Sequence, residues 1–315
     1  MDLSAKIGNL VIDPALSTES GIFSQPHVLE KISEYDIGAV FIKSTGIKPR
    51  LGNMEPVVVQ ATDETLLNAM GLPNPGYRNL REELKEVYPL RTGKKLICSV
   101  FGDTEDEIAE VATGLEDYCD GIELNFSCPN IKPCETTGVT IGRDPKRVES
   151  FTKAVTDKVK KPVIVKLTPS VYDIGEVARA AERADATAIS AINTVPDGMV
   201  IDIYAKRPVL SAKYGGVSGR GILSLGVGAV SKIYESVKIP IIGGGGATFA
   251  EDVIQFYEAG ADVVGLGTAF YQNGETLGAE KVGAYLKGLR LDIEKILEKM
   301  NVSNIREIKG VAHES

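Results

Sequence analysis

The chain has 315 residues, of which 43% are hydrophobic and 25% are charged, and its formal net charge is −8 at pH 7. This composition excludes a disordered chain, allows a large hydrophobic core, and argues against nucleic acid or an acidic membrane surface as a partner. No apolar run reaches the roughly 20 residues of a membrane span, and residues 1–10 lack the features of a signal peptide, so we expect a cytoplasmic protein.

Short and almost continuously apolar segments predict eight strands that are buried on both faces. In chain order they cover residues 13–21, 38–43, 95–100, 121–126, 163–167, 186–192, 239–244 and 262–267. Helical patterns lie between them at residues 104–118, 144–159, 173–184, 224–237 and 248–261. Thr104 is a typical N-cap residue, and Asp144 followed by Pro145 is a typical helix start.

The alternation of strands and helices predicts parallel βαβ units, and eight such units favour a closed (β/α)8 TIM barrel. We therefore expect residues 1–315 to form a single domain. An open, doubly wound sheet is the alternative, but no G-x-G-x-x-G motif follows the first predicted strand. Three connections are long, at about residues 44–77, 131–143 and 194–221, and in a barrel all three lie on the carboxyl-terminal face with the active site.

Polar residues and glycines cluster at the carboxyl ends of the predicted strands, where a barrel carries its chemistry. They are Ser20, Gly21, Lys43, Ser44, Asn125, Ser127, Cys128, Lys166, Asn193, Thr194, Gly243 to Gly246, Gly267 and Thr268. A buried lysine needs an anionic partner, so Lys43 and Lys166 indicate anionic groups nearby unless they extend to solvent. Asn125 and Asn193 offer donors and acceptors to a flat heterocyclic ligand, unless they cap turns.

The glycine-rich segments after the last two strands, GGGG at 243–246 and GLGTAF at 265–270, expose backbone N–H groups that suit a phosphate. The alternative is that these glycines only allow tight turns. A phosphate site, two lysines and several amides together indicate flavin mononucleotide (FMN), with Lys166 near the pyrimidine end of the ring. These residues predict an FMN-dependent barrel oxidoreductase but do not specify its substrate.

The chain has four cysteines and two histidines. Cys98, Cys119, Cys128 and Cys134 form no C-x-x-C pair, so we expect no metal centre within this chain. Because histidines are so few, acid–base chemistry falls to Cys, Lys, Asp or Glu. Local sequence alone favours an inert, buried thiol at Cys128, and Cys134 in the long loop is the competing candidate for a reactive thiol.

Several motifs, in order along nearly the whole chain, resemble the dihydroorotate dehydrogenases. They are NAMGLPNPG (68–76), LNFSCPN (124–130), VKLTPSVYDI (165–174), AINTVPDGMVIDI (191–203), GGVSG (215–219), IIGGGG (241–246) and ADVVGLGTAF (261–270). The NPG at 74–76 and the segment 198–219 are most similar to the branch that reduces NAD through an electron-transfer subunit containing FAD and an iron–sulfur cluster.

The resemblance implies a noncovalently bound FMN and oxidation of (S)-dihydroorotate to orotate in pyrimidine biosynthesis. In that family the cysteine of the SCPN motif takes the C5 proton while C6 delivers hydride to flavin N5, a role that carries over to Cys128; a thiol with an ordinary pKa of about 8.5 is a usable base near neutral pH. The substrate residues implied in the same way are Lys43, Asn68, Met70, Gly71, Leu72, Asn125, Asn130, Asn193 and Thr194. The implied FMN residues are Ser20, Gly21, Lys43, Ser44, Asn125, Lys166, Gly219, Gly244, Gly245, Gly267 and Thr268.

Some points remain open at the level of the sequence. The loop IKPCETTGVTIG at 131–142 departs from the glycine-rich loops of related proteins, which leaves its substrate contacts undefined. The partner subunit is the favoured electron acceptor, with fumarate second, and related proteins suggest a homodimer or a heterotetramer. An FMN-dependent oxidoreductase of uracil-type dihydropyrimidines and a non-redox barrel that binds phosphate ligands are the alternative functions.

Overall fold

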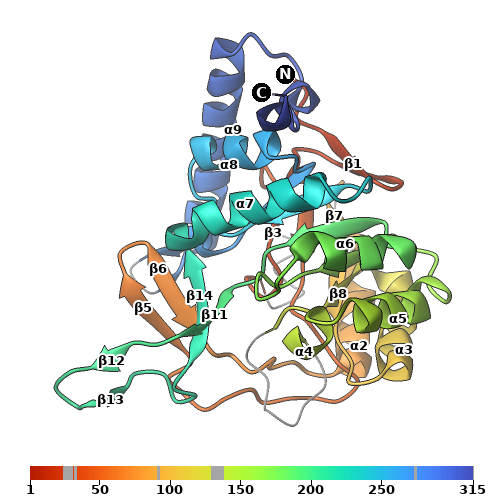
Figure 1. Ribbon diagram of the computed structural model, residues 1–315, viewed down its shortest axis with the longest axis vertical. Coiled ribbons are helices and arrows are strands. Elements are labelled where there is room, and N and C mark those ends of the chain that lie inside the picture. Colours follow the sequence, from red (N-terminus) through yellow and green to blue (C-terminus); the bar gives the residue numbers. More distant parts are fainter. Residues whose placement is uncertain (24–30, 32–33, 91–92, 129–137, 273–274, 315) are drawn as a thin grey trace.

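The computed structural model describes residues 1–23, 31, 34–90, 93–128, 138–272 and 275–314. Its centre is a closed barrel of parallel strands, each paired with the next in chain order and the last paired with the first. The barrel strands are β3 (Leu16–Thr18), β4 (Ala39–Phe41), β7 (Lys95–Val100), β8 (Gly121–Asn125), β9 (Val163–Lys166), β10 (Ala188–Ala191), β15 (Ile241–Gly244) and β16 (Val263–Leu266). The eight predicted strands and the (β/α)8 fold are therefore confirmed (Figure 1).

Helices lie outside the barrel (Figure 1), and most of them connect successive barrel strands. They are α2 (Tyr77–Val87), α3 (Glu105–Leu115), α4 (Val139–Gly142), α5 (Pro145–Thr156), α6 (Ile174–Arg183), α7 (Leu223–Tyr234), α8 (Ala250–Glu258) and α9 (Ala279–Lys299). Two helix starts follow the predicted caps: Thr104 Oγ1 accepts a hydrogen bond from the N–H of Glu107 at 3.2 Å, and Asp144 Oδ1 accepts one from Lys146 at 2.9 Å. The five predicted helices are confirmed, whereas α2, α4 and α9 are additional.

Burial on both faces explains why the barrel strands are almost continuously apolar in the sequence. Every residue of β8, β9, β10, β15 and β16 is buried, because helices cover the outside and side chains of neighbouring strands fill the inside. One hydrophobic cluster joins these strands to the inward faces of the surrounding helices. The barrel is therefore a packed core that holds the strand ends in fixed positions.

The long connections 44–77 and 194–221 contain regular structure that the sequence did not predict. They supply β5 (Val58–Thr62), β6 (Thr65–Asn68), β11 (Val195–Gly198) and β14 (Gly215–Gly219), which form an antiparallel sheet in the order β11-β14-β6-β5. A hairpin of β12 (Ile201–Asp202) and β13 (Arg207–Pro208) projects from this side of the molecule (Figure 1). These strands are short, contain glycine and proline, and are partly exposed, so they lack the pattern of a barrel strand.

The remaining strands form two small hairpins, β1 (Ala5–Ile7) with β2 (Leu10–Ile12) and β17 (Tyr271–Gln272) with β18 (Glu275–Thr276). The two termini lie close together beside α8 and α9 (Figure 1), and an ion pair of 2.7 Å joins Arg306 to Asp2. Within the described ranges, none of the helices is long and apolar enough to cross a membrane.

A glycine before β4 gives a test of barrel packing. A Cβ added at Gly38 would lie 2.6 Å from both the backbone nitrogen of Asp13 and the side chain of Ile12. We expect Gly38→Ala to destabilise the protein by about 1–3 kcal/mol, because backbone atoms cannot move aside cheaply. The free energy of unfolding in urea measures this loss.

The matched control is Gly228→Ala in α7, where an added Cβ meets no atom within 4 Å. Alanine in a helix interior is favoured over glycine by about 0.5–1 kcal/mol, so this variant should be slightly more stable than the wild type. Equal losses in both variants would contradict the packing argument.

Candidate active site

A cavity of about 190 Å³ lies at the carboxyl ends of the barrel strands, and residues of β5, β6 and β14 form one of its walls. It brings together predicted residues that are far apart in the sequence. Those that line it are Ser20, Gly21, Lys43, Ser44, Asn68, Met70, Gly71, Leu72, Asn125, Cys128, Lys166, Asn193, Thr194, Gly219, Gly245, Gly267 and Thr268. Gly244 is buried at the end of β15 and is not part of the lining, and Asn130 lies outside the described residues.

Some lining residues were missed by the sequence reasoning. Glu19 immediately precedes Ser20 after the first barrel strand, so a complete reading of polar residues at strand ends would have included it. Leu66 and Ser218 come from β6 and β14, and no barrel pattern could point to them. Tyr271 was also missed, and it lies in the lining with Gly246 of the predicted GGGG segment.

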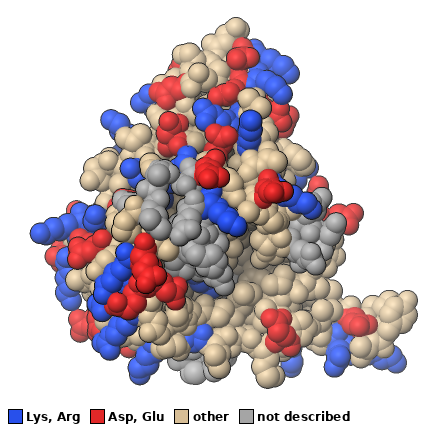
Figure 2. Space-filling model, turned by 180° about the vertical axis from the view of Figure 1, so that it is seen from behind, with Lys and Arg blue, Asp and Glu red and all other residues tan. Residues whose placement is uncertain are grey.

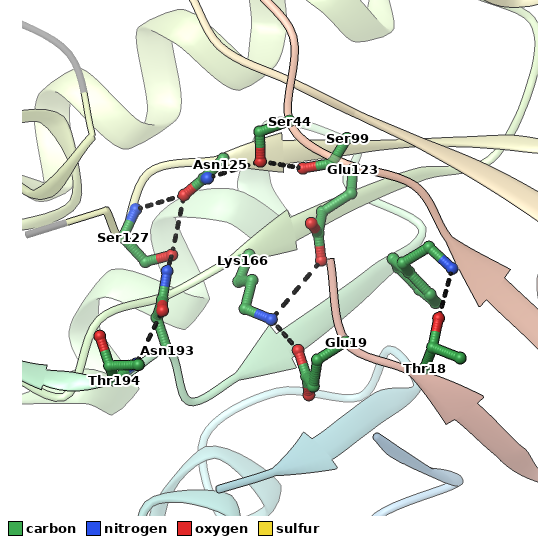
Figure 3. A network of polar contacts seen from close by, with 11 residues as sticks. Thr18, Glu19, Ser44, Ser99, Glu123, Asn125, Ser127, Lys166, Asn193 and Thr194 are labelled. Atoms are coloured by element: carbon green, nitrogen blue, oxygen red, sulfur yellow. Dashed lines mark hydrogen bonds and ion pairs between the residues drawn. The ribbon is translucent and has the colours of Figure 1, made fainter. Parts of the chain in front are cut away.

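A chain of hydrogen bonds fixes the amides on one side of the cavity (Figure 3). Asn125 Nδ2 donates to Ser44 Oγ at 2.8 Å, and Asn125 Oδ1 accepts from the hydroxyl of Ser127 at 3.0 Å. Ser127 Oγ in turn accepts from Asn193 Nδ2 at 2.9 Å, and Asn193 Oδ1 accepts from the N–H of Thr194 at 2.7 Å. Both amide nitrogens carry a second N–H that can serve a ligand, in an orientation that the network has already set.

Cys128 lies directly beyond this network. Its side chain lines the cavity, is 8% exposed and packs against Leu72 and Phe101, while its C=O accepts a hydrogen bond from Val139 at 3.1 Å. Burial lowers the pKa of the Lys43 ammonium, and negative charge on Cys128 acts in the opposite direction. Lys43 and Cys128 therefore lie close enough to interact electrostatically.

The other cysteines differ in their surroundings. Cys98 in β7 and Cys119 are fully buried in the core, and neither lines the cavity. Burial raises the pKa of Cys98 well above its ordinary value, which suits an inert thiol. Cys134 lies outside the described residues.

Lys166, at the end of β9, is the most strongly compensated charge in the cavity. Its ammonium pairs with the Glu19 carboxylate and lies 4.0 Å from Glu123 Oε2 (Figure 3). Burial acts to lower the pKa of Lys166, but the two carboxylates outweigh it and hold this pKa above its ordinary value. Lys166 therefore remains a cation although its side chain is only 4% exposed.

Backbone groups dominate the glycine-rich end of the cavity, which Gly219, Gly245 and Gly246 line. Gly219, Gly245 and Gly246 have φ values of 96°, 121° and 98°, a region that side chains other than glycine rarely adopt. A Cβ on Gly246 would lie 2.7 Å from the carbonyl oxygen of Gly219. The glycines are therefore required by close backbone approach, and they also leave the backbone open to a ligand.

The segment that leads into α7 also reaches this end, where Ile222 lines the cavity. A 3-10 turn, Arg220–Ile222, precedes α7 directly, and the N–H of Leu223 donates to the C=O of Arg220. The glycine backbone, rather than the helix start, therefore fits the phosphate of FMN. Lys166 and the fixed amides fit its ring and a second flat ligand.

The surface around the barrel carries both signs of charge. Lys and Arg side chains are interspersed with Asp and Glu side chains over the face that Figure 2 shows. In the described ranges, no group of three or more His, Cys, Asp and Glu side chains is arranged to hold a metal ion. The polar chemistry of the cavity described above thus rests on lysines, carboxylates, amides, hydroxyls and one thiol.

Comparisons with known proteins identify the family of the chain. A family model described as dihydroorotate dehydrogenase matches residues 2–287. The chain is 41% identical over 314 residues to the "Dihydroorotate dehydrogenase B (NAD(+)), catalytic subunit" of Pyrococcus furiosus, covering 99% of both chains. It is also 41% identical over 298 residues to the protein of the same name from Methanocaldococcus jannaschii, covering 94% of this chain and 93% of that one.

The fold is shared with a solved structure of lower sequence similarity. A crystal structure of DHODH from Eimeria tenella in complex with ferulenol superposes with a TM-score of 0.83 at 20% identity, covering 99% of this chain and 89% of that one. The family match and the relatives extend over nearly all of the barrel and its cavity. The chain belongs to the dihydroorotate dehydrogenase family, FMN-dependent oxidoreductases that convert dihydroorotate to orotate in pyrimidine biosynthesis.

Proposed function

We propose that this chain is the catalytic subunit of a dihydroorotate dehydrogenase that passes electrons to NAD through a partner protein, with Cys128 as the catalytic base. The observation that carries the proposal is the position of Cys128: its thiol lines the same cavity as Lys43, the fixed amides and the glycine-rich end. A base, a cation and amide hydrogen-bond donors thus line one cavity, where a single pyrimidine can contact all of them.

The reaction needs two bonds to carbon to break. Cys128 as thiolate takes the proton from C5, the C5–C6 double bond forms, and the hydride leaves C6. The chemistry that bound FMN supplies is acceptance of this hydride at N5. Asn125 and Asn193 hold the pyrimidine amide groups in plane, because their own orientation is fixed by Ser127 and Thr194.

Lys43 supports a carboxylated substrate. Its ammonium lies in the cavity, where burial lowers its pKa, and an anionic ligand restores the favourable charge. The orotate carboxylate can supply that anion, whereas uracil has none. Lys43 also interacts electrostatically with Cys128, so one cation serves both binding and proton removal.

The acceptor and the partner follow from the names of the relatives. Several relatives at about 40% identity carry the name "Dihydroorotate dehydrogenase B (NAD(+)), catalytic subunit". We propose that this chain is likewise a catalytic subunit. Its partner is an electron-transfer subunit that contains FAD and an iron–sulfur cluster. The cytoplasmic location and the homodimeric or heterotetrameric state expected from the sequence stay predictions.

The direct test is an anaerobic half-reaction. Purified, FMN-loaded protein is mixed with dihydroorotate, and flavin absorbance is followed in a stopped-flow instrument. We expect the yellow colour to bleach without any partner, because this chain alone contains the proposed base and the flavin site. A flavin that stays oxidised while the protein is fully loaded would rule out this substrate.

Replacement of the base separates proton removal from cofactor binding. We expect Cys128→Ala to retain FMN but to lose flavin reduction by about 10²–10⁴-fold near neutral pH, the usual contribution of a general base. Cys134→Ala is the matched cysteine control and should react like the wild type. Loss of reduction in Cys134→Ala with normal rates in Cys128→Ala would reverse the assignment.

Lys43→Met tests recognition of the carboxylate. Hydrogen bonds to charged groups contribute about 1.5–3 kcal/mol, so orotate should bind the variant about 10- to 100-fold more weakly. Uracil, which lacks the carboxylate, should lose much less affinity. Both affinities are measurable by titration of the flavin spectrum in variants checked for FMN content, and equal losses for the two ligands would favour a uracil-type substrate.

A further inference from the structure

Glu19 places a carboxylate inside the cavity. It follows β3 directly, and its side chain is 17% exposed. The carboxylate pairs with Lys166, which reaches the same point from the end of β9 (Figure 3). Segments from opposite sides of the barrel therefore meet in one ion pair in the cavity lining.

Two glycines make room for this carboxylate. A Cβ added at Gly244 in β15 or at Gly265 in β16 would overlap Glu19 Oε1. A Cβ at Gly267 would lie 3.5 Å from Cγ of Glu19. The ends of β15 and β16 thus form a side-chain-free recess in which the carboxylate of Glu19 fits.

Glu123 is the second carboxylate near Lys166. It is fully buried in β8, and neither of its side-chain oxygens has a hydrogen bond of regular geometry to a described residue. Burial raises the pKa of Glu123, Lys166 lowers it, and Glu19 raises it. Glu19 and Lys166 both line the cavity, whereas Glu123 does not, so Glu19 is the carboxylate of the three residues that a bound ligand can approach.

The charges of Lys166, Glu19 and Glu123 together set the electrostatic potential at a bound flavin. A cation near the pyrimidine end of the ring stabilises the negative charge that reduction creates there, and a paired carboxylate cancels part of that effect. Inside a buried cavity the effective dielectric constant is low, so one added negative charge has a large effect.

We propose that Glu19 is a positioning residue that orients Lys166 and screens its charge, and thereby lowers the reduction potential of the bound flavin. The inference rests on the proposed function, which puts Lys166 at the pyrimidine end of FMN. A lower potential makes the reduced flavin a stronger reductant. That is the direction needed by a chain whose electrons go to a nicotinamide.

The test compares midpoint potentials of the flavin in Glu19→Gln, Glu83→Gln and wild-type protein, each saturated with FMN. Glu83 is an exposed carboxylate on the outer helix α2, so its replacement makes the same charge change away from the cavity. We expect Glu19→Gln to favour the reduced flavin at least tenfold, a rise of about 30 mV for a two-electron couple. Glu83→Gln should match the wild type, and an unchanged midpoint in Glu19→Gln would overturn the inference.

A double-variant cycle tests whether Glu19 acts through Lys166. In a Lys166→Gln background, with FMN binding verified by fluorescence quenching, Glu19→Gln should shift the midpoint much less than it does in the wild type. A full shift in that background would show that Glu19 acts independently of Lys166 and would overturn the positioning role.

Chemical reductants and indicator dyes give the midpoint without dihydroorotate. The outcome therefore stays separate from the substrate assignment. If dihydroorotate fails to reduce the wild-type flavin, the proposed function is wrong. If the midpoint potential is unchanged in a Glu19→Gln enzyme that still reacts with dihydroorotate, only the role of Glu19 is wrong.

Discussion

Pairing of the last barrel strand with the first is the constraint on which the active site depends. Val264 and Gly265 of β16 pair with Leu16 and Ser17 of β3, so segments from the two ends of the barrel sequence become neighbours. Closure removes the sheet edges and fixes the stagger of every strand, and the strand ends therefore converge on one opening. Glu19 meets Lys166 and the glycines of β15 and β16 only because of this closure.

Lysine side chains that are buried at that opening need a negative charge nearby. Lys166 and Lys43 differ in where that charge comes from. Lys166 has two protein carboxylates as neighbours and stays charged in the core. For Lys43, burial outweighs the electrostatic interaction with Cys128 and lowers the pKa of the ammonium. The first arrangement is complete before any ligand arrives, while the second gains from an anionic ligand. The two lysines thus differ, because the protein itself compensates the charge of Lys166 while the charge of Lys43 is open to compensation by a ligand.

Much of the fold followed from the sequence because barrel strands and helix caps are local signals. Thr104 and Asp144 start helices as expected, and the polar residues at strand ends do converge. The antiparallel sheet could not be foreseen, because β6 and β14 stabilise each other only across a long stretch of chain. The same holds for the partners of buried charges: the sequence indicated that Lys166 needs an anion, but only the folded barrel identifies Glu19 and Glu123.

The antiparallel sheet beside the cavity also determines when, during synthesis, the cavity can form. Asn68 pairs with Gly216, and Leu67 with Val217, so this wall forms only after synthesis has passed β14. Contacts between such distant segments close large loops and form late in folding. A nascent chain that stops before β14 has many of its barrel strands but lacks one side of the cavity. The glycine-rich end of the cavity comes later still, because Gly245 and Gly267 follow β15 and β16, so the flavin site is complete only once these segments have been made.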